Sequence, residues 1–348
     1  MEIFIKGTNS ISPAGNFGNI THVPEIKFID GLLKYYSCVE PVYKEIINPV
    51  LLRRMSRTMK ISIVSAMLCL KDAGVEIPDA IIAGTGMGCV EDSDKFLSLL
   101  IENEERMLNP TPFIYSTHNT ISSQIAIMLK CHGYNSTYAG RGACFETSIL
   151  DALMLLSDGN ASNVLVGAYD ELIANQIRIL YRMGLFRETK ESNSNEISGN
   201  HPGEGAAFFV LSAKPSGKDY AKISGMSVFS ENEPLSESIT GFLKKHFISF
   251  ENINSVMFGN LHNNIQSGFY KKIVTLFPAF TNLLWFKHLC GEYMTSSAFA
   301  LWLGANCLKT QQIPEIAFLR KTNNLPAKNM LIINNLSGNQ FAIFLLTK

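Results

Sequence analysis

The chain has 348 residues, of which 46% are hydrophobic and 17% are charged, a balance typical of a well-buried α/β protein rather than a disordered one. Its 30 basic and 30 acidic residues cancel to a net charge of zero, and no run of lysine or arginine indicates a nucleic-acid partner. No apolar run approaches the roughly 18 residues of a membrane-spanning helix, so we expect no membrane partner.

The seven cysteines are scattered, without a CxxC pair: Cys38, Cys69, Cys89, Cys131, Cys144, Cys290 and Cys307. This spacing argues against a zinc site. The first residues resemble a strand rather than the charged start of a signal peptide. We therefore expect a cytoplasmic protein with reduced thiols and no bound metal.

The first predicted elements alternate between strands and helices. A strand covers Ile3–Ile5, a helix runs from about 51 to 72 and stops before Gly74, and a buried strand covers Ala80–Ala83. The glycine turn Gly84–Gly88 follows that strand. Its spacing matches neither a P-loop nor a dinucleotide fingerprint, so we expect no nucleotide and no other cofactor.

A second helix is predicted after residue 116. Pro110 and Pro112 are expected to break the chain before it. His118 and Asn119 lie in the polar cluster at its start. Both are possible neighbours of a site, but capping or ordinary hydrogen bonding is the favoured interpretation of His118.

The stretch Tyr138–Leu156 carries the strongest chemical signal. Gly140 and Gly142 predict a tight turn, and the apolar side chains from Phe145 onward recur at helical spacing. Cys144 therefore falls at a helix N-terminus, where free N–H groups and the helix dipole favour a thiolate. A thiolate at a sharp turn predicts a nucleophile, with a small buried core cysteine as the alternative.

The rest of the chain predicts a second half built like the first. Strands are predicted at 163–167 and 203–211, and residues 214–219 are typical of a hinge. We therefore divide the chain into an N-terminal half, 1–218, and a C-terminal half, 219–348.

In the second half, a strand is predicted near 221–224, a helix near 234–248, and further strands at Ser255–Phe258 and near Met330–Ile333. Strands alternating with helices predict an α/β fold with mostly parallel sheets. Ligands of such folds gather at the carboxyl ends of the strands.

Five motifs occur in a distinctive order: Gly84-Thr-Gly-Met-Gly88, the Cys144 turn, Val166-Gly-Ala-Tyr-Asp-Glu171, Gly203-Glu-Gly-Ala206 and Lys287-His-Leu-Cys-Gly291. Together they resemble the β-ketoacyl-acyl carrier protein synthases of the thiolase superfamily, over nearly the whole chain. Residues 116–120 and 286–293 also resemble a branch found beside aryl-polyene or flexirubin-type pigment synthases, whose members are often labelled chain-length-factor-like.

The resemblance implies a thiolase-like duplicated five-layer αβαβα fold with the site between the halves. It implies a homodimer, or a heterodimer with a ketosynthase, in which the strand at 163–167 and the segment around Asn119 lie close to the partner. It also implies a decarboxylative Claisen condensation. In that reaction a cysteine takes an acyl group from acyl carrier protein, and two histidines stabilise charge while malonyl-carrier protein loses carbon dioxide.

Residue by residue, the resemblance makes Cys144 the acyl-accepting cysteine and Lys287 the lysine ahead of the second histidine. Where the family has that histidine, this chain has Glu292. An ionised carboxylate there would oppose an enolate, whereas a carboxyl kept protonated by burial would donate a hydrogen bond.

The first histidine is expected just after the strand at 255–258. Gly259 and Asn260 occupy this place, and His262 lies two or three positions further on. Removing one donor to an oxyanion costs on the order of 10²–10³ in rate, so the altered site puts the ordinary condensation in doubt.

Three interpretations follow. The chain is a ketosynthase-like acyltransferase loaded at Cys144, or a catalytically silent chain-length-factor-like partner of an active ketosynthase. A hydrolase or thiolase acting on acyl-coenzyme A ranks last, because the site lacks a second base. The loss of both histidines favours the silent partner, and the retained cysteine favours the enzyme.

Overall fold

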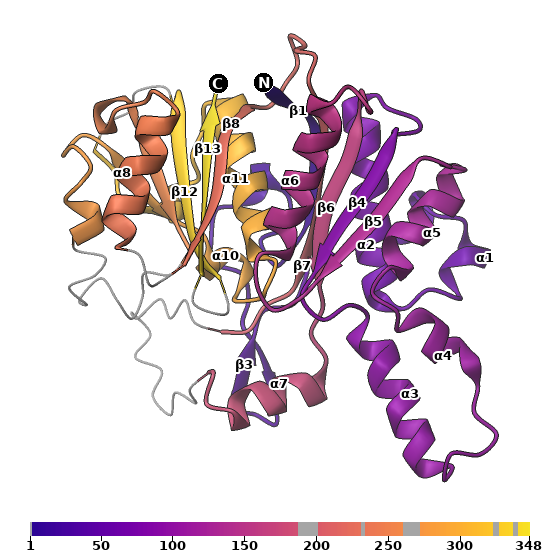
Figure 1. The fold of residues 1–348 in the computed structure, drawn as a ribbon. Helices are drawn as coiled ribbons and strands as arrows, with labels where there is room; N and C mark the ends of the chain where they lie inside the picture. Colours follow the sequence, from indigo (N-terminus) through magenta and orange to yellow (C-terminus); the bar gives the residue numbers. More distant parts are fainter. Residues whose placement is uncertain (1, 187–200, 231–233, 260–271, 323–326, 337–339) are drawn as a thin grey trace.

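The computed structural model describes residues 2–186, 201–230, 234–259, 272–322, 327–336 and 340–348. Within these ranges, eleven strands form one mixed sheet and two short strands form a separate pair (Figure 1). No helix in the described part of the chain is long and apolar enough to cross a membrane.

The helices and strands alternate along the chain, as expected. Before residue 218 they are β1 (Ile3–Ile11), β2 (Lys27–Ile29), β3 (Leu33–Tyr35), α1 (Pro49–Leu52), α2 (Arg57–Ala73), β4 (Ala80–Thr85), α3 (Val90–Glu102), α4 (Pro110–Tyr115), α5 (Thr120–Leu129), β5 (Tyr134–Ala139), α6 (Cys144–Ser157), β6 (Val164–Asp170), α7 (Ala174–Arg182) and β7 (Gly205–Ser212). After it they are β8 (Lys222–Ser230), α8 (Leu235–Lys245), β9 (Ser255–Phe258), β10 (Asn282–Trp285), α10 (Lys287–Cys290), α11 (Ser296–Thr310), β11 (Phe318–Arg320), β12 (Asn329–Leu336) and β13 (Gln340–Thr347).

The strand order repeats on the two sides of residue 218. It reads β5-β4-β6-β7-β1 on one side and β10-β9-β12-β13-β8 on the other. On each side, the second strand in this order is parallel to both neighbours, and the other two pairings are antiparallel. These two sides, called below the first and the second sheet, are joined through a short antiparallel pairing of β1 with β8. The repeat supports a division at residue 218, although the boundary itself stays a prediction.

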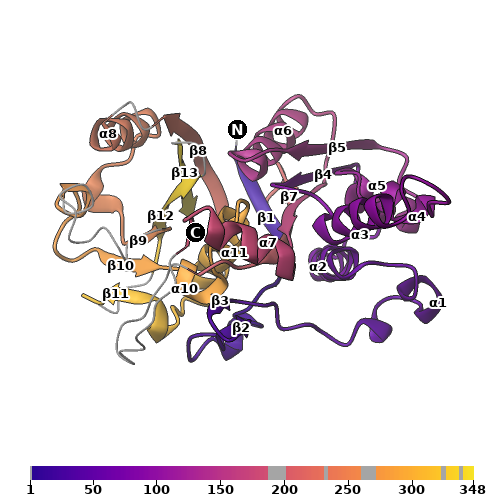
Figure 2. The same cartoon turned by 90° about the horizontal axis from the view of Figure 1, so that it is seen from below.

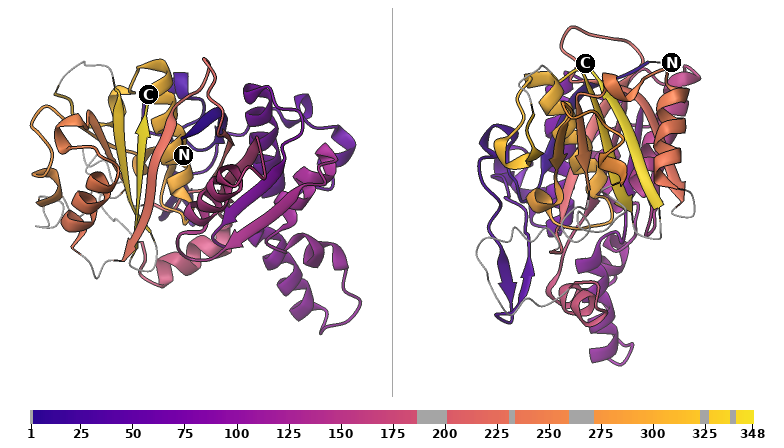
Figure 3. Two further views of the ribbon diagram at one scale, coloured as in Figure 1. Left: turned by 45° about the horizontal axis from the view of Figure 1, so that its top comes forward. Right: turned by 90° about the vertical axis from the view of Figure 1, so that its left-hand side faces the viewer.

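Helices α6 and α11 lie between the two sheets (Figures 1 and 2). The ring of Phe145 on α6 lies 5.9 Å from that of Phe209 on β7 and 6.1 Å from that of Phe344 on β13, so α6 packs against both sheets. Helices α2 and α5 cover the outer face of the first sheet, and α8 covers that of the second (Figure 3). The layers therefore run helix, sheet, helix, sheet, helix, and the expected thiolase-like five-layer fold is confirmed.

Two local predictions about helices are wrong. The helix expected over 51–72 is two helices, α1 and α2, with a turn between them. Pro110 and Pro112 begin α4 rather than break the chain, because proline fits the first helical turn. The side chain of Asn109 caps that turn by accepting a 3.0 Å hydrogen bond from a backbone N–H group.

One prediction about the strands is also corrected. The sheets are mixed rather than mostly parallel, partly because β13 forms an antiparallel strand that was not predicted. The strand expected at 163–167 is β6, which is paired on both edges by β4 and β7. Its expected place close to a partner stays a prediction. β5 is the edge strand on this side, and edge strands are the ones free to pair with another chain.

Candidate functional site

Cys144 is the first residue of α6 and lies directly over the end of β4, just before the glycine turn. A Cβ atom added to Gly84 in β4 would lie 2.9 Å from the carbonyl carbon and oxygen of Cys144. Only glycine therefore lets the end of this strand approach α6 so closely. The predicted helix start at Cys144 is confirmed. The Gly84–Gly88 motif and the Cys144 motif are in direct backbone contact.

The Cys144 thiol is buried and protonated. The residue is only 6% exposed, and Sγ donates to the carbonyl oxygens of Gly140 at 3.4 Å and Gly142 at 3.7 Å. Burial, followed by the nearby acidic groups of Asp170 and Glu146, raises the pKa of the thiol to about 12. The N–H groups of α6 act in the opposite direction but are outweighed, so the burial of the site favours the neutral thiol over the predicted thiolate.

Lys287 and Glu292 form a largely buried ion pair. Nζ of Lys287 lies 2.7 Å from Oε1 and 2.6 Å from Oε2 of Glu292, and 3.4 Å from the carbonyl oxygen of Asn335. The Lys287 side chain is 4% exposed and that of Glu292 is 28% exposed. The Glu292 carboxyl is therefore paired with a lysine rather than buried alone among apolar groups.

The late Lys-x-x-x-Gly motif contacts the Gly-Glu-Gly motif through the backbone. A Cβ atom on Gly203 would lie 2.1 Å from the carbonyl oxygen of Cys290, and one on Gly291 would lie 2.5 Å from Cα of Gly203. Gly291 also has a φ of +78°, which favours glycine. The N–H of Gly203 donates to Glu292 O at 3.0 Å, and the N–H of Glu292 donates to His201 O at 2.8 Å. These contacts hold Glu292 in place.

Glu204, the acid of the Gly-Glu-Gly motif, has a structural role. Its carboxylate accepts hydrogen bonds of 2.6 Å from both Nη1 and Nη2 of Arg57 on α2. It also accepts bonds of 3.0 Å from the Ser37 hydroxyl and from the N–H groups of Cys38 and Leu172. Glu204 thus holds α2, the segment before it and the segment after β6 around one buried charge.

Asp170, at the end of β6, ties the two halves together. Its Oδ1 accepts a hydrogen bond of 2.8 Å from the N–H of Gly86 and one of 3.3 Å from the Thr85 hydroxyl. Its Oδ2 accepts bonds from the N–H (3.0 Å) and hydroxyl (2.8 Å) of Thr295, at the start of α11. Burial raises the pKa of Asp170, and these hydrogen bonds oppose the rise. Its place at the carboxyl end of a strand was the sequence signal for this residue.

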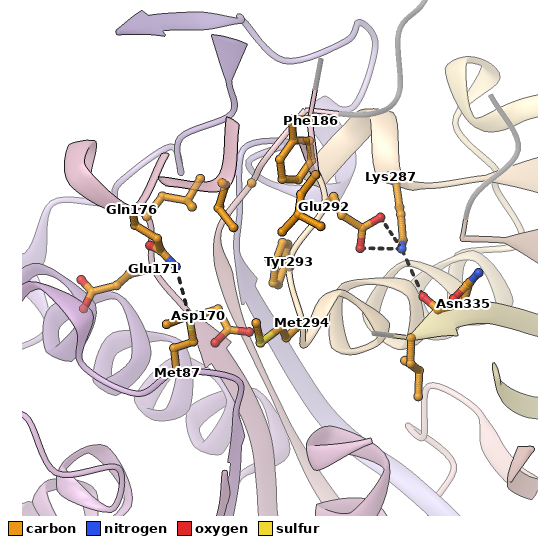
Figure 4. Close-up of a pocket in the computed structure, with 15 residues that line it drawn as sticks. Met87, Asp170, Glu171, Gln176, Phe186, Lys287, Glu292, Tyr293, Met294 and Asn335 are labelled. Carbon is orange, nitrogen blue, oxygen red and sulfur yellow. Dashed lines mark hydrogen bonds and ion pairs between the residues drawn. The ribbon is translucent and has the colours of Figure 1, made fainter. Parts of the chain in front are cut away.

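A cavity of about 320 Å³ lies between these elements (Figure 4). One wall carries the Lys287–Glu292 pair, and Asp170, Glu171, Gln176 and Asn335 are other polar residues of the lining. The apolar part comes from Met87, Leu172, Leu180, Leu185, Phe186, Met294 and Leu336. Cys144 is not among the described residues that line this cavity. The structure therefore brings Lys287 and Glu292 together without placing them in the same cavity as the thiol.

His118 and Asn119 are exposed and do not line the cavity. The carbonyl oxygen of His118 accepts a hydrogen bond of 2.7 Å from the Tyr169 hydroxyl. Asn119 is the N-cap residue of α5, and its Nδ2 donates to Ser123 Oγ at 3.3 Å. A role for either residue near the site stays a prediction.

Gly259 ends β9, as expected, and its N–H donates to the carbonyl oxygen of Ile333 at 2.9 Å. A Cβ atom there would lie 1.9 Å from Asn334 Oδ1. Asn260 and His262 lie outside the described residues. In the ranges that are described, no group of three or more His, Cys, Asp or Glu side chains is arranged to hold a metal ion.

Comparisons with known proteins confirm the resemblance to the β-ketoacyl synthases. Residues 36–178 match the family model described as beta-ketoacyl synthase, N-terminal domain. This range includes the glycine turn, Cys144 and Asp170. No curated protein sequence matches the chain.

Solved structures share the whole fold. The ishigamide ketosynthase/chain length factor superposes with a TM-score of 0.81 at 17% identity, covering 100% of this chain and 99% of that one. A ketosynthase in complex with its chain length factor from Xenorhabdus doucetiae has a TM-score of 0.76 at 15% identity, covering 99% and 98%. A third structure is a complex of a type II polyketide synthase acyl-carrier protein with its ketosynthase, bound to the hexaketide. It has a TM-score of 0.78 at 12% identity, covering 99% of this chain and 98% of that one. The fold is that of ketosynthases and chain length factors.

Proposed function

We propose that the chain is a non-condensing, chain-length-factor-like subunit that pairs with an active ketosynthase in fatty acid- or polyketide-type biosynthesis. The Lys287–Glu292 ion pair carries this proposal. The resemblance implies a histidine at position 292, where a hydrogen-bond donor stabilises a developing enolate. A carboxylate at that point repels the negative charge, and losing one such donor costs about 3–4 kcal/mol of transition-state stabilisation.

The state of Cys144 supports the same proposal. A thiol whose pKa is raised to about 12 has a very small thiolate fraction at neutral pH, and the thiolate is the form that attacks a thioester.

A second candidate is acyl transfer to Cys144 without condensation. The thiol keeps its place at the N-terminus of α6, where the backbone N–H groups of Cys144 and Phe145 lower its pKa against the effect of burial. Such N–H groups also form oxyanion holes. Acyl capture needs a thiolate and an oxyanion hole but no enolate stabilisation, so the ion pair does not oppose it.

The proposed partner surface surrounds the edge strand β5. Four apolar side chains are exposed on β5 and the helices that pack on it: Tyr134 (45%), Ile127 on α5 (69%), and Leu150 (49%) and Met154 (57%) on α6. Exposed apolar groups beside an unpaired strand edge are typical of an association surface. We propose that this face binds the ketosynthase, to which acyl carrier protein delivers acyl and malonyl groups.

Intact-protein mass spectrometry separates the two candidates. The wild-type chain and Cys144→Ala are incubated with acyl- and malonyl-carrier protein after the thiols are shown to be reduced. If the chain is a catalytically silent subunit, neither protein carries an adduct. An acyl adduct on the wild type that Cys144→Ala lacks would contradict the silent subunit and support acyl capture without condensation.

A further inference from the structure

We propose that the side chain of Met294 closes Cys144 off from the neighbouring cavity, so that one methionine controls access to the thiol. This inference concerns access alone and holds whichever of the two functions the chain performs. The segment Gly84–Gly88 contacts both Cys144 and Met294.

Met294 lies directly against Gly86, two residues after the glycine beneath Cys144. A Cβ atom added to Gly86 would lie 2.3 Å from Sδ, 2.6 Å from Cβ and 2.9 Å from Cγ of Met294. Gly84 at the end of β4 thus lies against the backbone of Cys144, and Gly86 just after the strand lies against the side chain of Met294. Met294 also lines the cavity, whereas Cys144 is not part of its described lining.

Asp170 holds Met294 in this place. One carboxylate oxygen binds the N–H of Gly86 at 2.8 Å, and the other binds the N–H of Thr295 at 3.0 Å. The carboxylate therefore fixes the turn and the residue next to Met294 relative to each other. Figure 4 shows Asp170 and Met294 side by side at the cavity wall. Asp170 is also close enough to Cys144 to raise the pKa of its thiol, although burial has the larger effect.

The chemistry of methionine suits a closure of this kind. Its side chain is unbranched and flexible, and it fills irregular apolar gaps without a polar group to satisfy. Truncating it to alanine leaves the backbone hydrogen bonds to Asp170 intact. The structure thus predicts that Met294→Ala connects the thiol with the cavity, whose apolar side chains can pack against an alkyl chain.

The test is the rate at which Cys144 reacts with a long N-alkyl maleimide at neutral pH, followed by peptide mapping. We expect Met294→Ala to label about tenfold faster or more than the wild type, because access and thiolate character control thiol reactivity. Met294→Leu, which keeps the bulk, is expected to label as slowly as the wild type. Leu180→Ala enlarges the same cavity from the side of α7, and its Cys144 is also expected to label as slowly as that of the wild type.

Cys307, fully buried on α11, provides an internal control. Labelling of Cys307 reports unfolding, so the Cys144 rate is read only while Cys307 stays unmodified. If Met294→Ala unfolds, Met294→Val, which removes less bulk, replaces it. Equal Cys144 rates in the wild type and a folded truncation variant would overturn the proposal, as would equal acceleration by Leu180→Ala.

Discussion

Replacing Glu204 with glutamine is expected to lower the free energy of unfolding by about 3 kcal/mol, near the lower end of the range for breaking a buried ion pair. The Glu204 side chain is 2% exposed, and its partner Arg57 is 29% exposed and also pairs with Glu40. Arg57 stays partly exposed to solvent and keeps its ion pair with Glu40 in the variant. The loss of folding free energy is therefore expected to stay below the largest values for breaking a buried ion pair. Urea unfolding at pH 7 measures it.

Glu171→Gln is the matched control, at a second buried glutamate nearby. Burial raises the pKa of Glu171 to about 8, so its carboxyl is largely protonated at pH 7. Glutamine resembles that neutral form, and we expect a change below about 1 kcal/mol. A loss at Glu171 as large as that at Glu204 would contradict the assignment of Glu204 as the buried charge that α2 needs.

The same control has a pH signature. The folded-state pKa of Glu171, about 8, lies above its ordinary value of 4.5. The folded protein therefore binds this proton more tightly, and the stability from this group falls as the pH rises from 4.5 through 8. Glu171→Gln removes this loss, so the variant should gain stability relative to the wild type at pH 9.

Gly203→Ala is expected to destabilise the fold by about 3 kcal/mol or more, at the upper end of overpacking effects. The new Cβ would meet the Cys290 carbonyl oxygen at 2.1 Å. The backbone of residue 203 fixes the position of this Cβ, and the oxygen that it meets is also a backbone atom. The contact therefore cannot be relieved by rotating a side chain. Denaturant unfolding of the purified variant gives the change in free energy.

Gly241→Ala on α8 should have the opposite sign. Nothing lies within 4 Å of an added Cβ there, and alanine in place of glycine stabilises an exposed helix by about 0.5–1 kcal/mol. Similar effects at both positions would show that glycine content, rather than the contact between Gly203 and the late motif, governs stability.

Local patterns in the sequence predicted the frame of the site well. The helix start at Cys144 and the bounds of the strand at Ser255–Phe258 were predicted correctly, because glycine turns and apolar runs act over a few residues. The resemblance rested on Gly203 and Gly291 in separate weak motifs. Their backbone contact is the physical reason why the two motifs occur together.

Tertiary packing decided the properties that the sequence alone did not predict. The helix N-terminus at Cys144 suggested a thiolate, but α6 is buried between two sheets, and the cost of burying a charge depends on that packing. The sequence did not predict the ion pair of Glu292 with Lys287, because only the fold brings the two side chains within 2.6 Å of each other. Met294 had no signal of its own, since a methionine in an apolar segment is usually a core residue.

The last strand shows a different limit. The apolar run over 341–346 was not predicted as a strand, because a short continuous apolar run is ambiguous without periodicity. In the structure it pairs on both edges, with β12 and β8. β8 is distant in the sequence, and polar residues separate β12 from this run, so the local pattern did not link the run to either strand.

The central claim is that this chain does not condense acyl groups. The most direct test reconstitutes it with a ketosynthase partner whose own nucleophilic cysteine is replaced by alanine, and measures 3-oxoacyl product from acyl- and malonyl-carrier protein. The account predicts no product from this pair, and full product when an intact partner is combined with Cys144→Ala of this chain. Product from the pair in which Cys144 is the only nucleophile would contradict the account.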